Sequence, residues 1–117
     1  MALHRQHLEV EEIGDITVVN FTDKNLNEWD IQIIGQRLFG LVNEQGKKNI
    51  LLDFTNVEYL PTAGLGKLII LNDKVINAGG KLVICSAPPN ICKIFEIVRL
   101  NKLIQIVEHQ QEGLLVF

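Results

Sequence analysis

Thr62, Gly64 and Gly66 stand close together at the end of residues 53–66, where an apolar run passes through a short loop into a helical pattern. Thr62 is a residue type that a protein kinase can phosphorylate, and it stands where the N-cap of that helix belongs. Gly64 and Gly66 fall within the first turn. Glycine costs a helix about 1 kcal/mol relative to alanine, so two in one turn indicate either close packing on a sheet or a flat surface for a partner.

The remaining chemistry-bearing residues form no pattern that is typical of catalysis. No glycine-rich phosphate loop, no Cys or His set of metal-ligand spacing and no neighbouring nucleophile and base is found. We therefore predict no enzyme activity, no cofactor and no bound metal. A small α/β enzyme or nucleotide binder stays open as an alternative on fold class alone. Each carboxylate is interpreted as a turn, cap or surface charge, and these are Asp15, Asp23, Asp30, Asp53 and Asp73.

The cysteines and histidines are also predicted to be structural or solvated. Cys85 and Cys92 lie in apolar segments, seven residues apart, and are expected to be buried thiols. His4 and His7 belong to the leading segment, where a solvated or expression-derived histidine is more common than a ligand. No role is assigned to His109.

Composition indicates one ordinary globular domain over residues 1–117. The chain is 47% hydrophobic and 21% charged, with a formal net charge of -3. Its Lys and Arg residues are dispersed, which argues against a nucleic-acid partner. No apolar run reaches the length of a signal peptide or a membrane span, so we predict a cytoplasmic protein with no membrane association.

The hydrophobic pattern predicts the elements that position Thr62. Strands are expected over 8–13 and 16–21, joined by a hairpin turn at 14–15. Buried strands are expected over 50–54 and 82–85, and a short last strand over 104–107. Three helices lie between them. One is capped by Asn27 and ended by Gly46, one begins after Pro61 and is stopped by residues 78–80, and one starts at 88–89.

The inward faces of these helices are also predicted from spacing. They are Ile31, Ile34, Leu38, Leu41 and Val42 on the first helix, Leu65, Leu68, Ile69, Val75 and Ile76 on the second, and Ile91, Ile94, Phe95 and Val98 on the third.

The order β-β-α-β-α-β-α-β predicts an α/β fold with a mixed, mostly parallel sheet covered by helices. The strand at 50–54 is expected at its centre. The tail at 108–117 ends in four apolar residues, which indicates a short helix docked on the sheet, although Gly113 counts against a helix.

Residues 53–66 resemble the signature of STAS domains of anti-sigma factor antagonists. In that family a strand with an Asp-containing apolar end is followed by Asp-Ser-Ser-Gly-Leu-Gly, which opens a helix. Gly64, Leu65 and Gly66 match as they stand, and Thr62 falls on the first serine, which the cognate anti-sigma factor kinase phosphorylates. The resemblance in element order extends over essentially the whole chain, including the loop that holds Asp23 and the run 79–82.

The resemblance implies a regulatory binding domain that docks on an anti-sigma factor kinase and is released by phosphorylation at Thr62. The implied partner-binding residues are Pro61, Thr62, Ala63, Gly64, Leu65, Gly66 and Asp23. Two of them depart from the signature, since Pro61 replaces its aspartate and Ala63 its second serine. These departures favour an alternative, in which the chain is an unphosphorylated scaffold subunit of a signalling complex.

Overall fold

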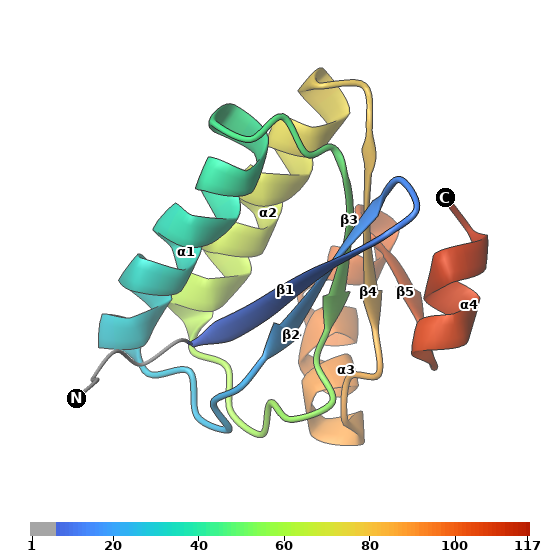
Figure 1. Cartoon of the computed structure of the whole chain (residues 1–117). Helices are drawn as coiled ribbons and strands as arrows, with labels where there is room; N and C mark the ends of the chain where they lie inside the picture. Colours follow the sequence, from blue (N-terminus) through green and yellow to red (C-terminus); the bar gives the residue numbers. More distant parts are fainter. Residues whose placement is uncertain (1–6) are drawn as a thin grey trace.

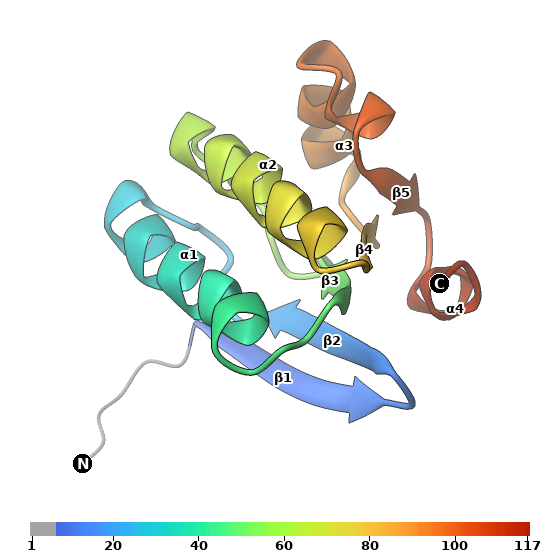
Figure 2. The same ribbon diagram turned by 90° about the horizontal axis from the view of Figure 1, so that it is seen from above.

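A computed structural model describes residues 7–117 and shows a five-stranded sheet with three helices on one face and one on the other (Figures 1 and 2). The elements are β1 (Leu8–Ile13), β2 (Ile16–Phe21), α1 (Glu28–Asn43), β3 (Asn49–Asp53), α2 (Thr62–Asn77), β4 (Lys81–Cys85), α3 (Pro89–Ile97), the 3-10 turn η1 (Leu100–Lys102), β5 (Gln105–Val107) and α4 (Gln110–Leu115). This confirms the predicted α/β fold and element order.

The sheet has the order β1-β2-β3-β4-β5, with β3 at its centre as predicted. β1 pairs antiparallel with β2 through the hairpin at Gly14, and the other neighbouring strands are parallel. The crossovers from β2 to β3 and from β3 to β4 contain α1 and α2, and the last contains α3 and η1. The sheet is therefore mixed and mostly parallel, with the carboxyl ends of β2, β3 and β4 at one edge.

The core has two layers because β3 alternates its side chains between the two faces of the sheet. Ile50 and Leu52 point into the larger layer beneath α1, α2 and α3, with Phe54 just beyond the strand. Leu51 points the other way, into a smaller layer with Val18, Val83 and Cys85 that α4 and the last residues cover. The near-continuous apolar run of this strand is thus explained by burial on both faces.

The inward faces of the helices were predicted correctly only in part. Ile31, Ile34, Leu38 and Leu41 of α1 are buried, and Val42 is half-buried. On α2, however, Ile69 and Ile76 are exposed, because the stripe that faces the sheet is Gly64, Leu68, Leu71 and Val75. The prediction that Val98 faces inward was also wrong, since α3 ends at Ile97 and Val98 is its exposed C-cap residue.

The tail does form a helix on the back of the sheet, and Gly113 is the residue that lets it come close. A Cβ at Gly113 would lie 2.6 Å from Leu51 Cδ1 in the smaller core layer. Gln110 and Lys81 also fix the tail, because Gln110 Nε2 donates to Asp53 Oδ2 at 2.9 Å and Lys81 Nζ to the Val116 carbonyl at 2.8 Å. Gly113 therefore allows α4 to pack closely on the sheet, which the spacing of apolar residues along the sequence did not indicate.

Gly80 offers a test of the close approach between the turn after α2 and the turn before β3. A Cβ at Gly80 would lie 1.9 Å from the carbonyl oxygen of Lys48, which accepts the Lys81 N–H. Because backbone cannot shift cheaply, Gly80→Ala should lower the free energy of unfolding by about 2–3 kcal/mol in urea titrations. Gly66→Ala, at a glycine with open space above it, is the control. Equal stability of the two variants would contradict the close approach.

Candidate partner-docking site

The loops that follow β2, β3 and β4 lie together at the carboxyl edge of the sheet, at the bottom of Figure 1. Backbone hydrogen bonds join the first two. The Lys24 carbonyl accepts the Glu58 and Tyr59 N–H groups at 2.7 and 3.1 Å, and the Leu26 N–H donates to the Tyr59 carbonyl at 3.2 Å. Asn25 and Tyr59 form an isolated parallel bridge at this point. The two loops therefore form one continuous ordered surface.

The start of α3, which follows the third loop, and the end of β3 are tied to the same surface by side chains. Asn90 Nδ2 donates to the Glu58 carbonyl at 3.0 Å, and Asn56 Nδ2 to the Phe21 carbonyl at 3.3 Å. The buried carboxylate of Asp53 accepts the Thr55 N–H at 2.9 Å and also the Thr55 hydroxyl. Asp53 is thus a buried turn-forming carboxylate that fixes the start of the loop leading to α2.

Helix α2 begins at Thr62, so the prediction that Thr62 is the N-cap was wrong by one residue. Pro61 is the N-cap, with φ -75° and ψ 162°, and it provides no side-chain hydrogen bond. Its fixed φ suits this extended position, and its carbonyl accepts the Gly64 N–H at 2.9 Å. Thr62 is therefore the first helical residue, with its side chain exposed at an end of the helix that no side chain caps.

The two glycines of the first turn have different roles. A Cβ at Gly64 would lie 2.5 Å from Leu60 Cδ1 and 3.2 Å from Ile31 Cδ1, so Gly64 is buried for packing. Apart from its chain neighbours and the nearby backbone of its own helix, no heavy atom of residues 7–117 lies within 4 Å of the position that a Cβ on Gly66 would occupy, and Gly66 is exposed. Only Gly66 retains the geometry of a docking glycine.

Three of the other predicted partner-binding residues are at least half-buried. Pro61 is buried, and Ala63 and Leu65 are half-buried against the larger core layer. Two exposed aromatic residues that the sequence analysis did not single out lie in the joined loops and the adjoining first turn of α1, namely Tyr59 and Trp29. Their exposure depends on tertiary packing, which the sequence pattern does not report.

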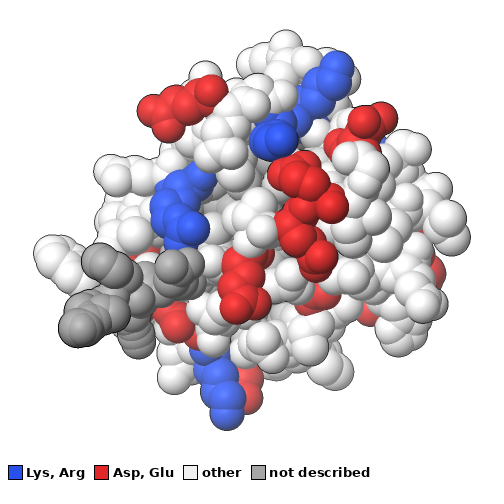
Figure 3. Space-filling view, in the orientation of Figure 1, with Lys and Arg blue, Asp and Glu red and all other residues white. Residues whose placement is uncertain are grey.

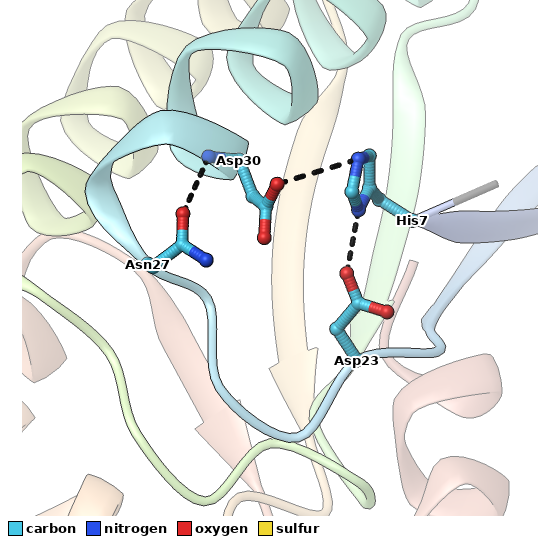
Figure 4. Close-up of polar contacts among 4 residues, drawn as sticks. All are labelled: His7, Asp23, Asn27 and Asp30. Atoms are coloured by element: carbon cyan, nitrogen blue, oxygen red, sulfur yellow. Dashed lines mark hydrogen bonds and ion pairs between the residues drawn. The ribbon is translucent and has the colours of Figure 1, made fainter. Parts of the chain in front are cut away.

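Asp23 belongs to a polar cluster that the sequence analysis missed (Figure 4). His7 is 5% exposed; its Nδ1 lies 2.5 Å from Asp23 Oδ2 and its Nε2 lies 3.6 Å from Asp30 Oδ1. Asp30 stands in the first turn of α1, where its N–H donates to the Asn27 cap at 2.9 Å. The interpretation of His7 as a solvated residue was therefore wrong, whereas His4 lies outside the described residues.

The hairpin explains why His7 reaches this edge. β1 is antiparallel to β2, so its first residue Leu8 pairs with Phe21 at the end of β2, and the Thr22 N–H donates to the His7 carbonyl at 3.0 Å. Within residues 7–117 this is the group of three side chains that could hold a metal ion. Each imidazole nitrogen faces a different carboxylate, which is the geometry of a bridge between Asp23 and Asp30.

The two cysteines are free thiols with little nucleophilic character. Burial raises the pKa of the Cys85 thiol to about 12, and the carboxylate of Asp53 adds to this shift. Cys92 is only half-buried, and burial followed by the charges of Glu96 and Glu108 raises its pKa as well. At neutral pH both side chains are protonated, so neither supplies a thiolate.

A family comparison decides what kind of domain this is. The family model described as the STAS domain matches residues 7–113. The chain belongs to the STAS domain family. This assignment confirms the resemblance seen in residues 53–66.

Individual relatives agree with the family assignment. A candidate anti-sigma factor antagonist of Bordetella bronchiseptica, BtrV, is 22% identical over 74 residues, which are 63% of this chain and 64% of that protein. The chain therefore aligns with slightly less than two thirds of that relative. An anti-sigma factor antagonist (STAS) domain protein from Planctomyces limnophilus has a similar structure, with a TM-score of 0.83 and 18% identity over 92% of this chain and 95% of that one.

The Bacillus cell fate determinant SpoIIAA, in its phosphorylated form, is a third similar structure. It has a TM-score of 0.72 and 13% identity, over 92% of this chain and 96% of that one. At these identities the solved structures show that the STAS fold is shared.

None of the helices within residues 7–117 has the length and apolar character that a membrane span requires.

The two glycines of the α2 first turn should respond oppositely to alanine. Gly64→Ala should lower the free energy of unfolding by about 1–3 kcal/mol, because its Cβ overlaps Leu60 in a packed core. Gly66→Ala should raise it by up to about 1 kcal/mol, because alanine favours the helix. Chemical denaturation of both variants measures the difference. A stable Gly64→Ala variant would overturn the packing role.

The histidine bridge should contribute to stability in a way that a surface histidine does not. His7→Ala leaves Asp23 and Asp30 without their shared partner, and should cost about 1–3 kcal/mol of unfolding free energy. His109→Ala is the control, because that imidazole is exposed to solvent. If the two alanine variants melt at the same temperature, the bridge makes no net contribution.

Proposed function

We propose that this STAS domain is an anti-sigma factor antagonist that binds an anti-sigma factor kinase through the carboxyl edge of its sheet. The kinase transfers the γ-phosphoryl group of ATP to the Thr62 hydroxyl and thereby ends the complex. The observation that carries the proposal is the position of Thr62, exposed at the uncapped start of α2 and beside the open surface of Gly66. The proposal places the protein in the cytoplasm with its partner.

The start of α2 is suited to accept a phosphate without unfolding the domain. Helix N-termini present free N–H groups and a partial positive charge. In α2 these groups have no side-chain cap, and the first turn contains no acidic residue that would repel an added anion. A phosphate on Thr62 would therefore supply a hydrogen-bond acceptor for these N–H groups and a negative charge in the first turn of α2.

Phosphorylation would lower the partner's affinity and leave the fold of the domain unchanged. A partner surface fitted to a neutral hydroxyl beside Gly66 would have to desolvate close to two negative charges and three oxygens. The loops at 22–27 and 54–61 are held together by backbone bonds, so they would keep their shape in both states. Loss of binding then needs no large conformational change.

The alternative function is an unphosphorylated scaffold subunit of a signalling complex. Pro61 and Ala63 favour it, because they replace the aspartate and second serine of the family signature. Both residues are at least half-buried here, so their side chains serve the packing of α2 and leave Thr62 as the hydroxyl of the motif. The two functions share a docking edge and differ in whether Thr62 is modified.

Two substitutions at Thr62 separate these functions. Thr62→Asp places a negative charge in the first turn, so its unfolding free energy should stay level or rise by about 0.3–1 kcal/mol, while affinity for the kinase falls at least tenfold. Thr62→Ala should change stability by less than about 0.5 kcal/mol, because the side chain is exposed and does not cap the helix. It should bind the kinase and accept no phosphate.

The measurements are calorimetric titration against the purified anti-sigma factor kinase and intact mass after incubation with ATP. Gln111→Glu is the charge control, since it adds one negative charge on α4, on the opposite face of the sheet. Equal affinity of wild type and Thr62→Asp, with no added phosphate, would favour the scaffold function. No binding by any variant would refute the docking edge itself.

A further inference from the structure

Strand β1 presents an open edge that the docking function does not use. Within residues 7–117 it is the first strand of the sheet and pairs with β2 alone, so its outer side has backbone N–H and C=O groups that no other described strand pairs with. At six residues it matches β2 as the longest strand. An edge of this length is sufficient to accept an added strand.

A groove of about 460 Å³ runs beside this edge, between β1 and the outer side of α1. Leu8 and Val10 line it from the strand, and Ile33 and Leu41 from the helix. Val10 is 41% exposed and Ile33 45%, so apolar surface remains open to solvent along the strand. The α1 side of the groove has one basic residue, Arg37, and one acidic residue, Glu44, so its net charge is close to zero.

The two faces of β1 differ in chemistry because the strand alternates. Leu8 and Val10 share the helix-covered face with Val19, whereas Glu9 and Glu11 share the opposite face with Asn20 and Val18. Figure 3 shows acidic side chains gathered over the course of this hairpin. Lys47 lies 3.5 Å from Glu12, but within residues 7–117 no ion pair forms with Glu9 or Glu11.

These charges argue against a second copy of the chain as the occupant. Two β1 strands paired edge to edge would bring Glu9 and Glu11 of one copy against those of the other, and like charges placed across a strand pair are destabilising. The same carboxylates would attract a strand that presents Lys or Arg on that face. Its alternate side chains would then point toward Val10 and Ile33 in the groove.

We propose that the β1 edge binds an extended segment of a protein partner in which basic and apolar residues alternate. The segment extends the sheet through backbone hydrogen bonds, with its basic side chains on Glu9 and Glu11 and its apolar side chains in the groove. This surface lies along β1, and its occupation is independent of any partner at Thr62.

The test uses a synthetic seven-residue peptide in which Lys and Val alternate, with both ends blocked, titrated into the ¹⁵N-labelled protein. Amide shifts should change along β1 and around Ile33, and binding should weaken as salt is raised. A matched peptide with Glu in place of Lys should leave the spectrum unchanged. The double variant Glu9→Gln/Glu11→Gln should bind the Lys peptide roughly fivefold more weakly, as expected for two exposed ion pairs.

Glu112→Gln is the control variant, because it removes an exposed carboxylate on α4, which packs against β3, β4 and β5 and away from β1, and should bind like wild type. Binding of both peptides alike, or shifts confined to another surface, would overturn the proposal. So would a double variant that dimerises by light scattering while wild type ignores the Lys peptide, since the carboxylates would then serve only to keep β1 edges apart.

Discussion

The central strand β3 is covered on both faces and hydrogen-bonded along both edges. Because its backbone has no access to water, a strand must pair with it on each edge, and helices must cover both faces. The crossovers through α1 and α2 make β2 and β4 those partners and make both pairings parallel. Parallel pairing places the carboxyl ends of three strands at one edge. The loops at 22–27, 54–61 and 86–88, and with them Thr62, lie where they do because of this strand.

The sequence was most informative where one physical requirement acted alone. Burial on both faces predicted β3 and β4, and the cap at Asn27 was identified from side-chain chemistry that operates within one turn. The STAS signature identified the segment that opens α2, and its Gly64-Leu65-Gly66 run matched without change. The same signature did not separate the glycines, because the difference between Gly64 and Gly66 depends on Leu60 in the preceding loop and on Ile31 of α1.

What could not be predicted depends on contacts between distant segments. His7 meets Asp23 and Asp30 only after the β1–β2 hairpin has returned to the carboxyl edge, and spacing along the chain does not record that meeting. Ile69 and Ile76 have helical spacing, but the sheet lies against the adjacent stripe of α2. Gly113 was counted against a helix, and its reason lies in Leu51, sixty-two positions earlier in the sequence.

The bonds that join the two loops at the carboxyl edge of the sheet are made by backbone atoms of Lys24, Leu26, Glu58 and Tyr59. A backbone bond does not depend on which side chain its residue has. The exposed side chains of Lys24, Asn25, Glu58 and Tyr59 can therefore be exchanged while the loops keep their shape. Duplicated copies of such a gene could diverge in these four residues alone. Each product could then bind a different partner while the backbone of the two loops stays the same.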